Sequence, residues 1–362
     1  MKIFKKFLFL LSSQERKQAY LLLSMIVVMA LLDMIGVASI MPFMAVLINP
    51  EIIETNNILN TLYKSLSVVG VETEKQFLFI LGVMVFVLLI FSITFKALAN
   101  FIQLRFTNLR EYTIGRRLIE GYLGQPYSWF LSRNSADLGK SILSEISIII
   151  GHGLTPMMEL IAKSLVAITL ISLLIFIDPK IALIAGFTIG VAYGLIYKFS
   201  RNFINRIGQE RVRANQMRYT AVSEAFGAFK EVKVCGLEKY FIDQFAQPAQ
   251  IYSRHVSSAS IISQLPRYAL ESITFGGMLI VILYLMSQKG SFTNAVPILA
   301  LYAFAGYRLI PALQGIYVAI TQIRFVTPAL NTLYNDLKNL NLEKIQHSKK
   351  IIKLNENIVL KN

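Results

Sequence analysis

Residues 199–225 read FSRNFINRIGQERVRANQMRYTAVSEA, and this stretch decides the fold. Its apolar residues recur at three-, four- and seven-residue steps, which is the spacing of one face of an amphipathic helix. These residues are Phe203, Ile207, Ala214, Met217, Ala221 and Ala225, and five arginines lie around them. The stretch directly follows an apolar block at 181–197, and no proline occurs between Pro179 and Pro248. We therefore expect one helix that crosses a membrane and continues well beyond it.

Similar apolar blocks recur along the chain. Of its 362 residues, 55% are hydrophobic and only 16% are charged, whereas soluble domains carry roughly 25% charged residues. The blocks that are nearly free of charge are 19–32, 77–95, 160–177, 181–197, 269–286 and 295–323. Most approach the ~17–25 residues of a membrane-spanning helix, and the first does so if it continues through Asp33 to Ile48. The sequence predicts an all-α membrane protein with six transmembrane helices.

Residues 1–18 allow two interpretations. They begin with a basic segment and a short apolar patch, as a secretory signal peptide does. However, the patch runs straight into charged residues and lacks a small-residue cleavage site. An amphipathic elbow on the inner membrane surface fits better.

Residues for metal or disulfide chemistry are sparse. Cys235 is the single cysteine, so no intramolecular disulfide can form. His152, His255 and His347 are far apart and show no metal-ligand spacing. We expect neither a metal site nor a catalytic site in this chain.

The basic residues predict the orientation. Segment 96–145 carries seven basic and four acidic residues, and segment 198–267 carries eleven and five. Segment 49–75 instead holds two lysines against four glutamates. Because positive loops stay inside, both termini should be cytoplasmic, in a bacterial-type inner membrane. This bias also explains the net charge of +15 without a nucleic-acid partner.

The inside connections continue the helical spacing instead of forming loops. A helix from 76 to 121 would be roughly 70 Å long, against a hydrocarbon core of about 30 Å. Such extensions can be a solvated bundle, a platform for a partner, or both.

At this point the chain resembles the transmembrane half of an ATP-binding-cassette exporter of type 1. LGQPYSWFLSRNSADLGKSI, from Leu123, is similar to the first cytoplasmic hairpin tip of these exporters. AVSEAFGAFKEVKVCGLEKYFIDQF, from Ala221, is similar to the second tip, where a short helix precedes a Gly-x-x-Lys-Glu-Val-Lys run. IDPKIAL, at 177–183, matches the turn between the third and fourth spans. The resemblance covers residues 1–340 and assigns 19–330 to the transmembrane domain.

The C-terminus resembles the approach to a nucleotide-binding domain. In the exporters a polar linker, here 331–350, leads into a domain that begins with a strand, and IVLKN within 351–362 is similar to its start. A phosphate-binding loop needs G-x-x-x-x-G-K-[ST], and NSADLGKS has Asn134 at the first glycine. The resemblance therefore implies that ATP and Mg²⁺ bind a nucleotide-binding domain, fused or separate, that this stretch lacks. We expect no ATPase activity from residues 1–362 alone.

One branch of the family fits best. LLDMIGVASIMPFMAVLINPE (31–51), QLPRYALESI (264–273) and AGYRLIPALQGIYVAI (305–320) resemble flippases for lipid-linked oligosaccharides. In those proteins a short external helix meets the lipid tail, and residues 58–66 could form one. The alternative for this helix is a cap on the bundle, and both interpretations remain open.

Three functions are compatible with these patterns. The favoured one is the membrane half of an ATP-driven flippase for a lipid-linked oligosaccharide or glycolipid. The second is an exporter of peptides, drugs or other lipids with the same fold. The third is a carrier without ATP, which the long inside hairpins disfavour because such a carrier has nothing to dock there. A six-span half cannot enclose a large cavity, so we also expect a homodimer.

The resemblance also implies two sets of functional residues. Arginines that match Arg267 and Arg308 engage the substrate pyrophosphate in these flippases, and Lys96 is a third candidate. A guanidinium offers phosphate a forked and permanently charged donor. Purely structural roles are the alternative. Arg267 can form an ion pair with Glu271 on the same helix face, and Lys96 and Lys163 can extend toward the membrane interface. Coupling to the nucleotide-binding domain would involve residues 126–134 and 220–232, above all Tyr127, Trp129, Phe130, Glu224, Phe226 and Lys230.

Overall fold

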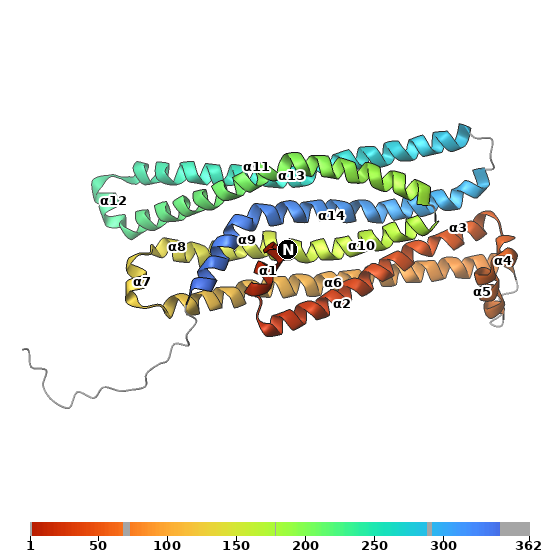
Figure 1. Cartoon of the computed structure of the whole chain (residues 1–362), viewed down its shortest axis with the longest axis horizontal. Coiled ribbons are helices and arrows are strands. Elements are labelled where there is room, and N and C mark those ends of the chain that lie inside the picture. The colour runs from red at the N-terminus through yellow and green to blue at the C-terminus, as the bar shows by residue number, and fades with distance from the viewer. Residues whose placement is uncertain (1, 68–72, 178, 288–291, 341–362) are drawn as a thin grey trace, which may run out of the picture.

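The computed structural model describes residues 2–67, 73–177, 179–287 and 292–340, and every regular element in these ranges is a helix (Figure 1). In chain order they are α1 (Lys2–Leu10), α2 (Ser13–Ala38), α3 (Ile40–Ile48), α4 (Ile52–Thr55), α5 (Asn57–Ser67), α6 (Glu74–Leu123), α7 (Tyr127–Leu131), α8 (Ser135–Lys140), η1 (Ser141–Glu145), α9 (Ile146–Ile149), η2 (Ile150–Leu154), α10 (Thr155–Ile177), α11 (Pro179–Gly227), α12 (Phe229–Cys235), α13 (Glu238–Ser287) and α14 (Phe292–Asn339). The elements η1 and η2 are π-helical. The all-helical prediction is confirmed.

Long helices lie side by side along one axis of the molecule. The helices α6, α11, α13 and α14 have 50, 49, 50 and 48 residues. At 1.5 Å per residue each is roughly 70–75 Å long, more than twice the thickness of a hydrocarbon core. Antiparallel α11 and α13 are joined by α12 at one end of the bundle, and α6 and α8 are joined by α7 at the same end (Figure 1). The predicted extensions beyond the membrane therefore exist as continuous helices.

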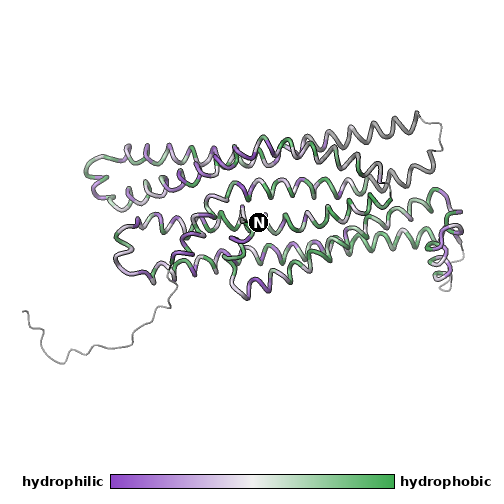
Figure 2. The backbone as a smooth tube through the Cα atoms, viewed as in Figure 1, coloured by the Kyte–Doolittle hydropathy of each residue, from purple (hydrophilic) through white to green (hydrophobic). Residues whose placement is uncertain are grey.

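The apolar residues concentrate away from the α7 and α12 end (Figure 2). Four helical stretches among the described residues are long and apolar enough to cross a membrane: Ser13–Ile48, Glu74–Leu123, Ser135–Ile177 and Ala303–Asn339. The other two predicted spans, 181–197 and 269–286, fall in α11 and α13, where many side chains lie outside the description. Six spans are compatible with this arrangement.

The third long helix contains a feature that the sequence did not reveal. Residues 135–177 run as one helix in which η1 and η2 are wider, π-helical segments. Such segments place one extra residue in a helical turn and often occur at functional sites. Glu145 of η1 bonds to Arg211 and Asn215 of α11, and His152 of η2 lines a pocket with residues of α11, α13 and α14.

The N-terminal helix α1 docks on the last helix. The rings of Phe9 and Tyr334 meet edge to face at 4.9 Å, and Lys6 Nζ donates a hydrogen bond to Asn331 Oδ1 at 2.6 Å. These contacts extend the core to Leu337 and Leu340, so the chain stays helical through Asn339. The first nine residues of the segment expected to be a linker, 331–339, therefore belong to α14. The expected strand at 351–362 lies outside the described residues.

A buried ion pair fixes the start of the first span. Ser12 caps α2: its Oγ accepts from Glu15 N, and Glu15 Oε2 accepts from Ser12 N at 2.8 Å. Glu15 also pairs with Arg110 of α6, and both side chains are at most one-tenth exposed. The elbow, α2 and α6 thus form one packed corner.

The predicted short helix at 58–66 is α5, at the opposite end of the bundle (Figure 1). Leu59 is buried, and Tyr63 meets Phe77 edge to face at 5.2 Å. Leu62 and Leu66 pack against the same cluster, whereas Ile58 is 73% exposed. Most of the apolar face is therefore covered by α3, α4 and α6, which favours a cap on the bundle over a free lipid-binding face.

Candidate functional site

Three long helices meet around a buried carboxylate in the apolar part of the bundle. Asp33 of α2 accepts hydrogen bonds from Arg308 Nη1 of α14 at 2.8 Å and from Lys96 Nζ of α6 at 3.2 Å. Ser92, one turn before Lys96, donates its hydroxyl to Asp33 Oδ1 at 2.8 Å. The structure thus brings together Arg308 and Lys96, two of the three residues expected to bind substrate, and adds Asp33 and Ser92. We call these four residues the Asp33 cluster.

The cluster has more positive than negative charge. Asp33 supplies one carboxylate for two cations, so the group carries a formal charge of +1. The Asp33 side chain is fully buried, that of Arg308 is 15% exposed, and that of Lys96 is 37% exposed. A charge at membrane depth costs at least about 2.5–3.5 kcal/mol and usually faces a partner or a cavity. The unmatched cation is therefore a candidate anion-binding group.

Lys163 of α10 contributes a further positive charge near the Asp33 cluster. Its electrostatic neighbours are Lys96, Asp33 and Glu159, the last of which lies one turn earlier on α10. Its aliphatic stem lies across Gly315 of α14, where an added Cβ would be 3.1 Å from Lys163 Cγ. The absence of a side chain at position 315 lets the lysine lie against α14. The sequence offered extension toward the membrane interface as one explanation for Lys163, and its contact with Gly315, more than 150 positions away, could not be predicted from local spacing.

Arg267 is not part of the Asp33 cluster. It lies on α13 with its side chain 54% exposed, and its Nε donates to Glu271 Oε1 at 2.8 Å. The intrahelical pair suggested by the four-residue spacing is confirmed. The sequence already distinguished the two arginines in this respect, since Arg308 has no acidic residue within one helical turn of it.

The residues expected to couple to a nucleotide-binding domain gather at one end of the bundle. α7 lies between α6 and α8, and α12 lies between α11 and α13 (Figure 1). Tyr127 and Phe226 are 78% and 76% exposed, and Glu224 and Lys230 are exposed beside them in the chain. These side chains are free to meet a partner.

Trp129 and Phe130 have a different environment. Trp129 packs on Tyr122 and Phe130 with ring centroids 5.5 and 5.1 Å apart, and Arg133 lies over its ring at 4.8 Å. The two residues are partly buried and hold α7 against α6, so they shape the tip more than they present a free surface.

The second tip differs in detail from the expectation. The short helix does not precede the Gly-x-x-Lys-Glu-Val-Lys run but is formed by it, as α12, Phe229–Cys235. The long helix α11 continues to Gly227 because its amphipathic spacing continues to that point. Gly236 ends α12 with φ of +62°, a left-handed conformation that glycine adopts without a steric penalty.

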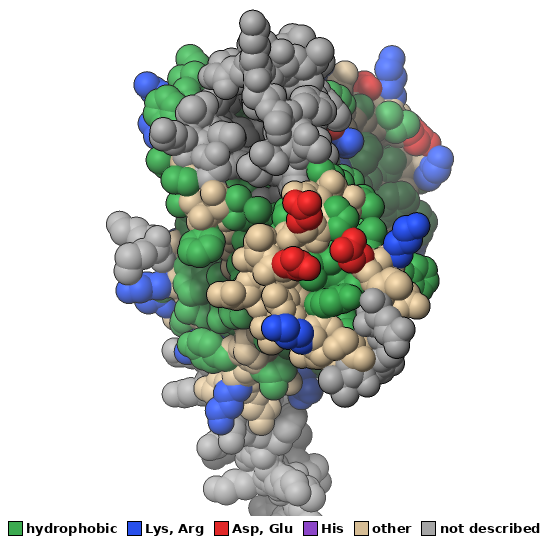
Figure 3. All heavy atoms as spheres, turned by 90° about the vertical axis from the view of Figure 1, so that its right-hand side faces the viewer, with side chains coloured by type: hydrophobic (Ala, Val, Ile, Leu, Met, Phe, Trp, Pro, Cys, Tyr) green, Lys and Arg blue, Asp and Glu red, His purple; other side chains and the backbone are tan. Residues whose placement is uncertain are grey.

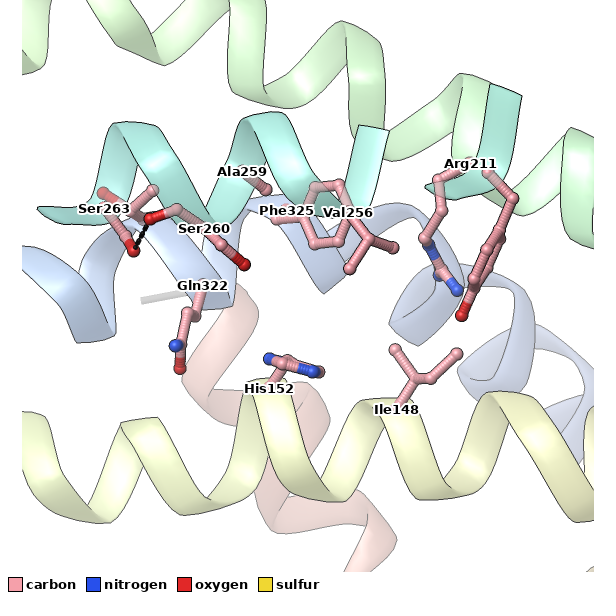
Figure 4. Close-up of a pocket in the computed structure, with 11 residues that line it drawn as sticks. Ile148, His152, Arg211, Val256, Ala259, Ser260, Ser263, Gln322 and Phe325 are labelled. Carbon is pink, nitrogen blue, oxygen red and sulfur yellow. Dashed lines mark hydrogen bonds between the residues drawn. The ribbon is translucent and has the colours of Figure 1, made fainter. Parts of the chain in front are cut away.

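A second polar cluster joins α11 to η1, beside the pocket that Figure 4 shows. Arg211 Nη2 of α11 donates to Glu145 Oε2 of η1 at 3.0 Å, and Asn215 Nδ2 donates to Glu145 Oε1 at 2.7 Å. Arg211 and Asn215 are completely buried. Next to them, His152, Ser260, Gln322 and Phe325 line a small pocket. This cluster fastens α11 to the π-helical segments and positions the extensions that carry α12.

Comparisons with known proteins agree with this architecture. Residues 26–307 match the family described as ABC transporter transmembrane region. A solved structure, of a bacterial Atm1-family ABC exporter with ATP bound, superposes with a TM-score of 0.63 at 13% sequence identity. The match covers 87% of this chain and 52% of that chain, and at this identity it supports the fold alone. Because the family match covers well over half of the 362 residues, the chain belongs to the family of ABC transporter transmembrane regions.

Proposed function

We propose that this chain is the membrane-spanning half of an ATP-driven flippase whose substrate has a phosphate-bearing headgroup, such as a lipid-linked oligosaccharide or a glycolipid. The observation that carries the proposal is the excess cation of the Asp33 cluster, which lies within apolar helices from three parts of the chain. Arg308 and Lys96 would bind the headgroup phosphate. Arg267 lies outside the cluster and is already paired with Glu271, so it would contribute little to phosphate binding.

Energy for transport would come from a nucleotide-binding domain, fused or separate, that binds ATP and Mg²⁺. It would dock on the exposed residues of the α7 and α12 end, here called the coupling surface: Tyr127, Glu224, Phe226 and Lys230. The continuous helices behind this surface would carry nucleotide-driven closure to the membrane as a rigid-body movement. Two copies of the chain would enclose the translocation cavity.

The orientation follows from the two ends of the molecule. The extensions at the α7 and α12 end carry the basic excess of segments 96–145 and 198–267, which supports a cytoplasmic location for that end. At the opposite end, Figure 3 shows acidic side chains near the centre, with lysine or arginine side chains below them and toward the edges. This end would face the outside of a bacterial-type inner membrane, with both chain termini inside.

The test uses the transporter with its nucleotide-binding domain, reconstituted in liposomes. Flipping of a fluorescent polyprenyl-pyrophosphate glycan is measured beside ATP hydrolysis. We expect Arg308→Gln and Lys96→Gln each to slow flipping by about tenfold or more, the loss typical of a charged hydrogen bond to substrate. Normal flipping by both folded variants would disprove the site.

The alternative is an exporter of peptides, drugs or other lipids. It shares the fold and the coupling surface, and it requires no phosphate. Stimulation of ATP hydrolysis by uncharged amphiphiles, with no response to polyprenyl pyrophosphates, would favour it. In either case residues 1–362 alone should hydrolyse no ATP, and robust hydrolysis would contradict both functions.

A further inference from the structure

Asp33 uses both of its carboxylate oxygens on groups of other helices. Oδ1 accepts from Ser92 and Arg308, each at 2.8 Å, and Oδ2 accepts from Lys96 at 3.2 Å. No side-chain surface of Asp33 is exposed. The carboxylate is therefore shielded from solvent, and its charged partners are the same two cations that would bind an anion.

The two cations are held unequally. Arg308 is closer to the carboxylate and only 15% exposed, whereas Lys96 is 37% exposed and makes the longer contact. Lysine is also a flexible point charge, while the guanidinium of arginine is planar and pre-oriented. An entering anion would thus meet the ammonium first, and the ammonium can turn from the carboxylate to the anion with little rearrangement.

We propose that Asp33 is an internal counter-ion of the anion site, which holds Lys96 and Arg308 in place when the site is empty and yields Lys96 to a phosphate-bearing substrate. This inference rests on the proposed function, and it identifies Asp33 as the residue that sets the affinity of the anion site. Because the carboxylate competes with the substrate phosphate for the same donors, it lowers binding affinity. When it recaptures Lys96, it assists release of the substrate.

A purely structural role for Asp33 makes a different prediction. If the carboxylate only ties α2 to α6 and α14, its removal loosens three helices and leaves anion binding equal or weaker. The counter-ion role predicts the opposite sign, since two unopposed cations attract an anion more strongly than two cations that share a carboxylate.

The experiment measures binding to the purified 362-residue chain in lipid nanodiscs. The probe is farnesyl pyrophosphate, with farnesol as the uncharged comparison and inorganic pyrophosphate to separate a lipid headgroup from a free anion. We expect Asp33→Asn to bind farnesyl pyrophosphate about tenfold more tightly, because one unit of negative charge leaves the site while the shape is kept. Glu120→Gln, which removes a carboxylate from an exposed pair with Arg116 on the same helix as Lys96 but outside the cluster, should stay within about twofold of the original protein.

A charge-balanced pair of variants tests the same idea if Asp33→Asn folds poorly. Lys96→Gln leaves Asp33 and Arg308 as a neutral pair, so binding should fall about tenfold. The double variant Asp33→Asn with Lys96→Gln leaves Arg308 unopposed, at the original formal charge of +1, and should restore binding. Helical content and gel-filtration profile are checked for each variant.

The outcomes separate the two proposals. If the original chain binds farnesyl pyrophosphate no better than farnesol, both the anionic substrate and the counter-ion are disproved. If it prefers the pyrophosphate but neither the single variant tightens binding nor the double variant restores it, only the counter-ion inference is disproved. Equal binding of inorganic pyrophosphate would overturn the assignment to a lipid headgroup.

Discussion

Arg211 Nη2 of α11 lies 3.0 Å from Glu145 Oε2 of η1, and neither side chain is more than 7% exposed. The two residues are 66 positions apart, and they join α11 to the helix that returns from α7. The pair is enclosed by Asn215, which donates to the same carboxylate, and by the ring of Phe325, 5.7 Å from the guanidinium carbon. A charge left alone in this setting is almost completely shielded from bulk water.

Breaking this pair from one side should strongly destabilise the protein. We expect Glu145→Gln or Arg211→Met to lower the free energy of unfolding by about 3–5 kcal/mol, because each leaves a buried charge without its partner. The double variant should cost less than the sum of the two single changes. Chemical unfolding of the detergent-solubilised chain, read as a double-mutant cycle, provides the coupling energy. Additive losses would show that the pair contributes nothing specific.

Close approach of α11 and α14 depends on Gly208. A Cβ added there would lie 2.4 Å from the carbonyl oxygen of Phe325, which is backbone and cannot turn away. Gly208→Ala should therefore force the helices apart and destabilise the protein by about 1–3 kcal/mol or more. Gly194→Ala is the matched control on the same helix, since nothing lies within 4 Å of its added Cβ. Thermal unfolding of the two variants compares them directly, and equal melting temperatures would contradict the packing described.

Docking of the N-terminal elbow depends on Gly153. A Cβ there would lie 2.8 Å from Phe7 Cζ and 3.0 Å from Val326 Cγ1, whereas Gly151 in the same segment has open space. We expect Gly153→Ala to detach α1 and increase proteolysis or amide exchange within residues 2–10. Gly151→Ala should leave both unchanged. The idea fails if Gly153→Ala leaves α1 as protected as it is in the original protein.

Arg267 and Arg308 should differ in their effects on transport. Arg267 is half exposed and already paired with Glu271, and exposed pairs of this kind contribute only ~0.3–0.5 kcal/mol. Arg267→Gln should therefore change flipping by about twofold or less, while Arg308→Gln removes a donor from the Asp33 cluster. The assay is the liposome flipping measurement described above. A larger loss from Arg267→Gln would move the main phosphate contact to α13.

Much of this architecture was readable from local patterns. The amphipathic spacing from Phe203 to Ala225 and the lack of proline predicted one long helix here, and α11 runs without a break from Pro179 to Gly227. The apolar spacing near Leu59 predicted α5 in the same way. Helical periodicity is local, so a few turns of sequence determine it.

Helix boundaries that depend on contacts between distant parts of the chain could not be predicted from the sequence. Residues 331–339 have the polar composition of a linker, yet they remain helical because Phe9 and Lys6 of α1 pack against them. The π-helical segments were equally hidden. Glu145 and His152 have their neighbours on α11, α13 and α14, and no local sequence pattern predicts the π-helical segments that contain them.

The sequence alone determined the class of the protein: long apolar helices with charged extensions, in the order and spacing of an exporter. It also identified Arg308 and Lys96 as ionisable residues inside spans. Only the tertiary structure decided that these two cations share Asp33 while Arg267 lies apart on α13. The reason is physical. Helix formation and membrane insertion follow from the residues of one segment, whereas a net charge in a buried site is set by side chains that meet across 63 and 275 positions of the chain.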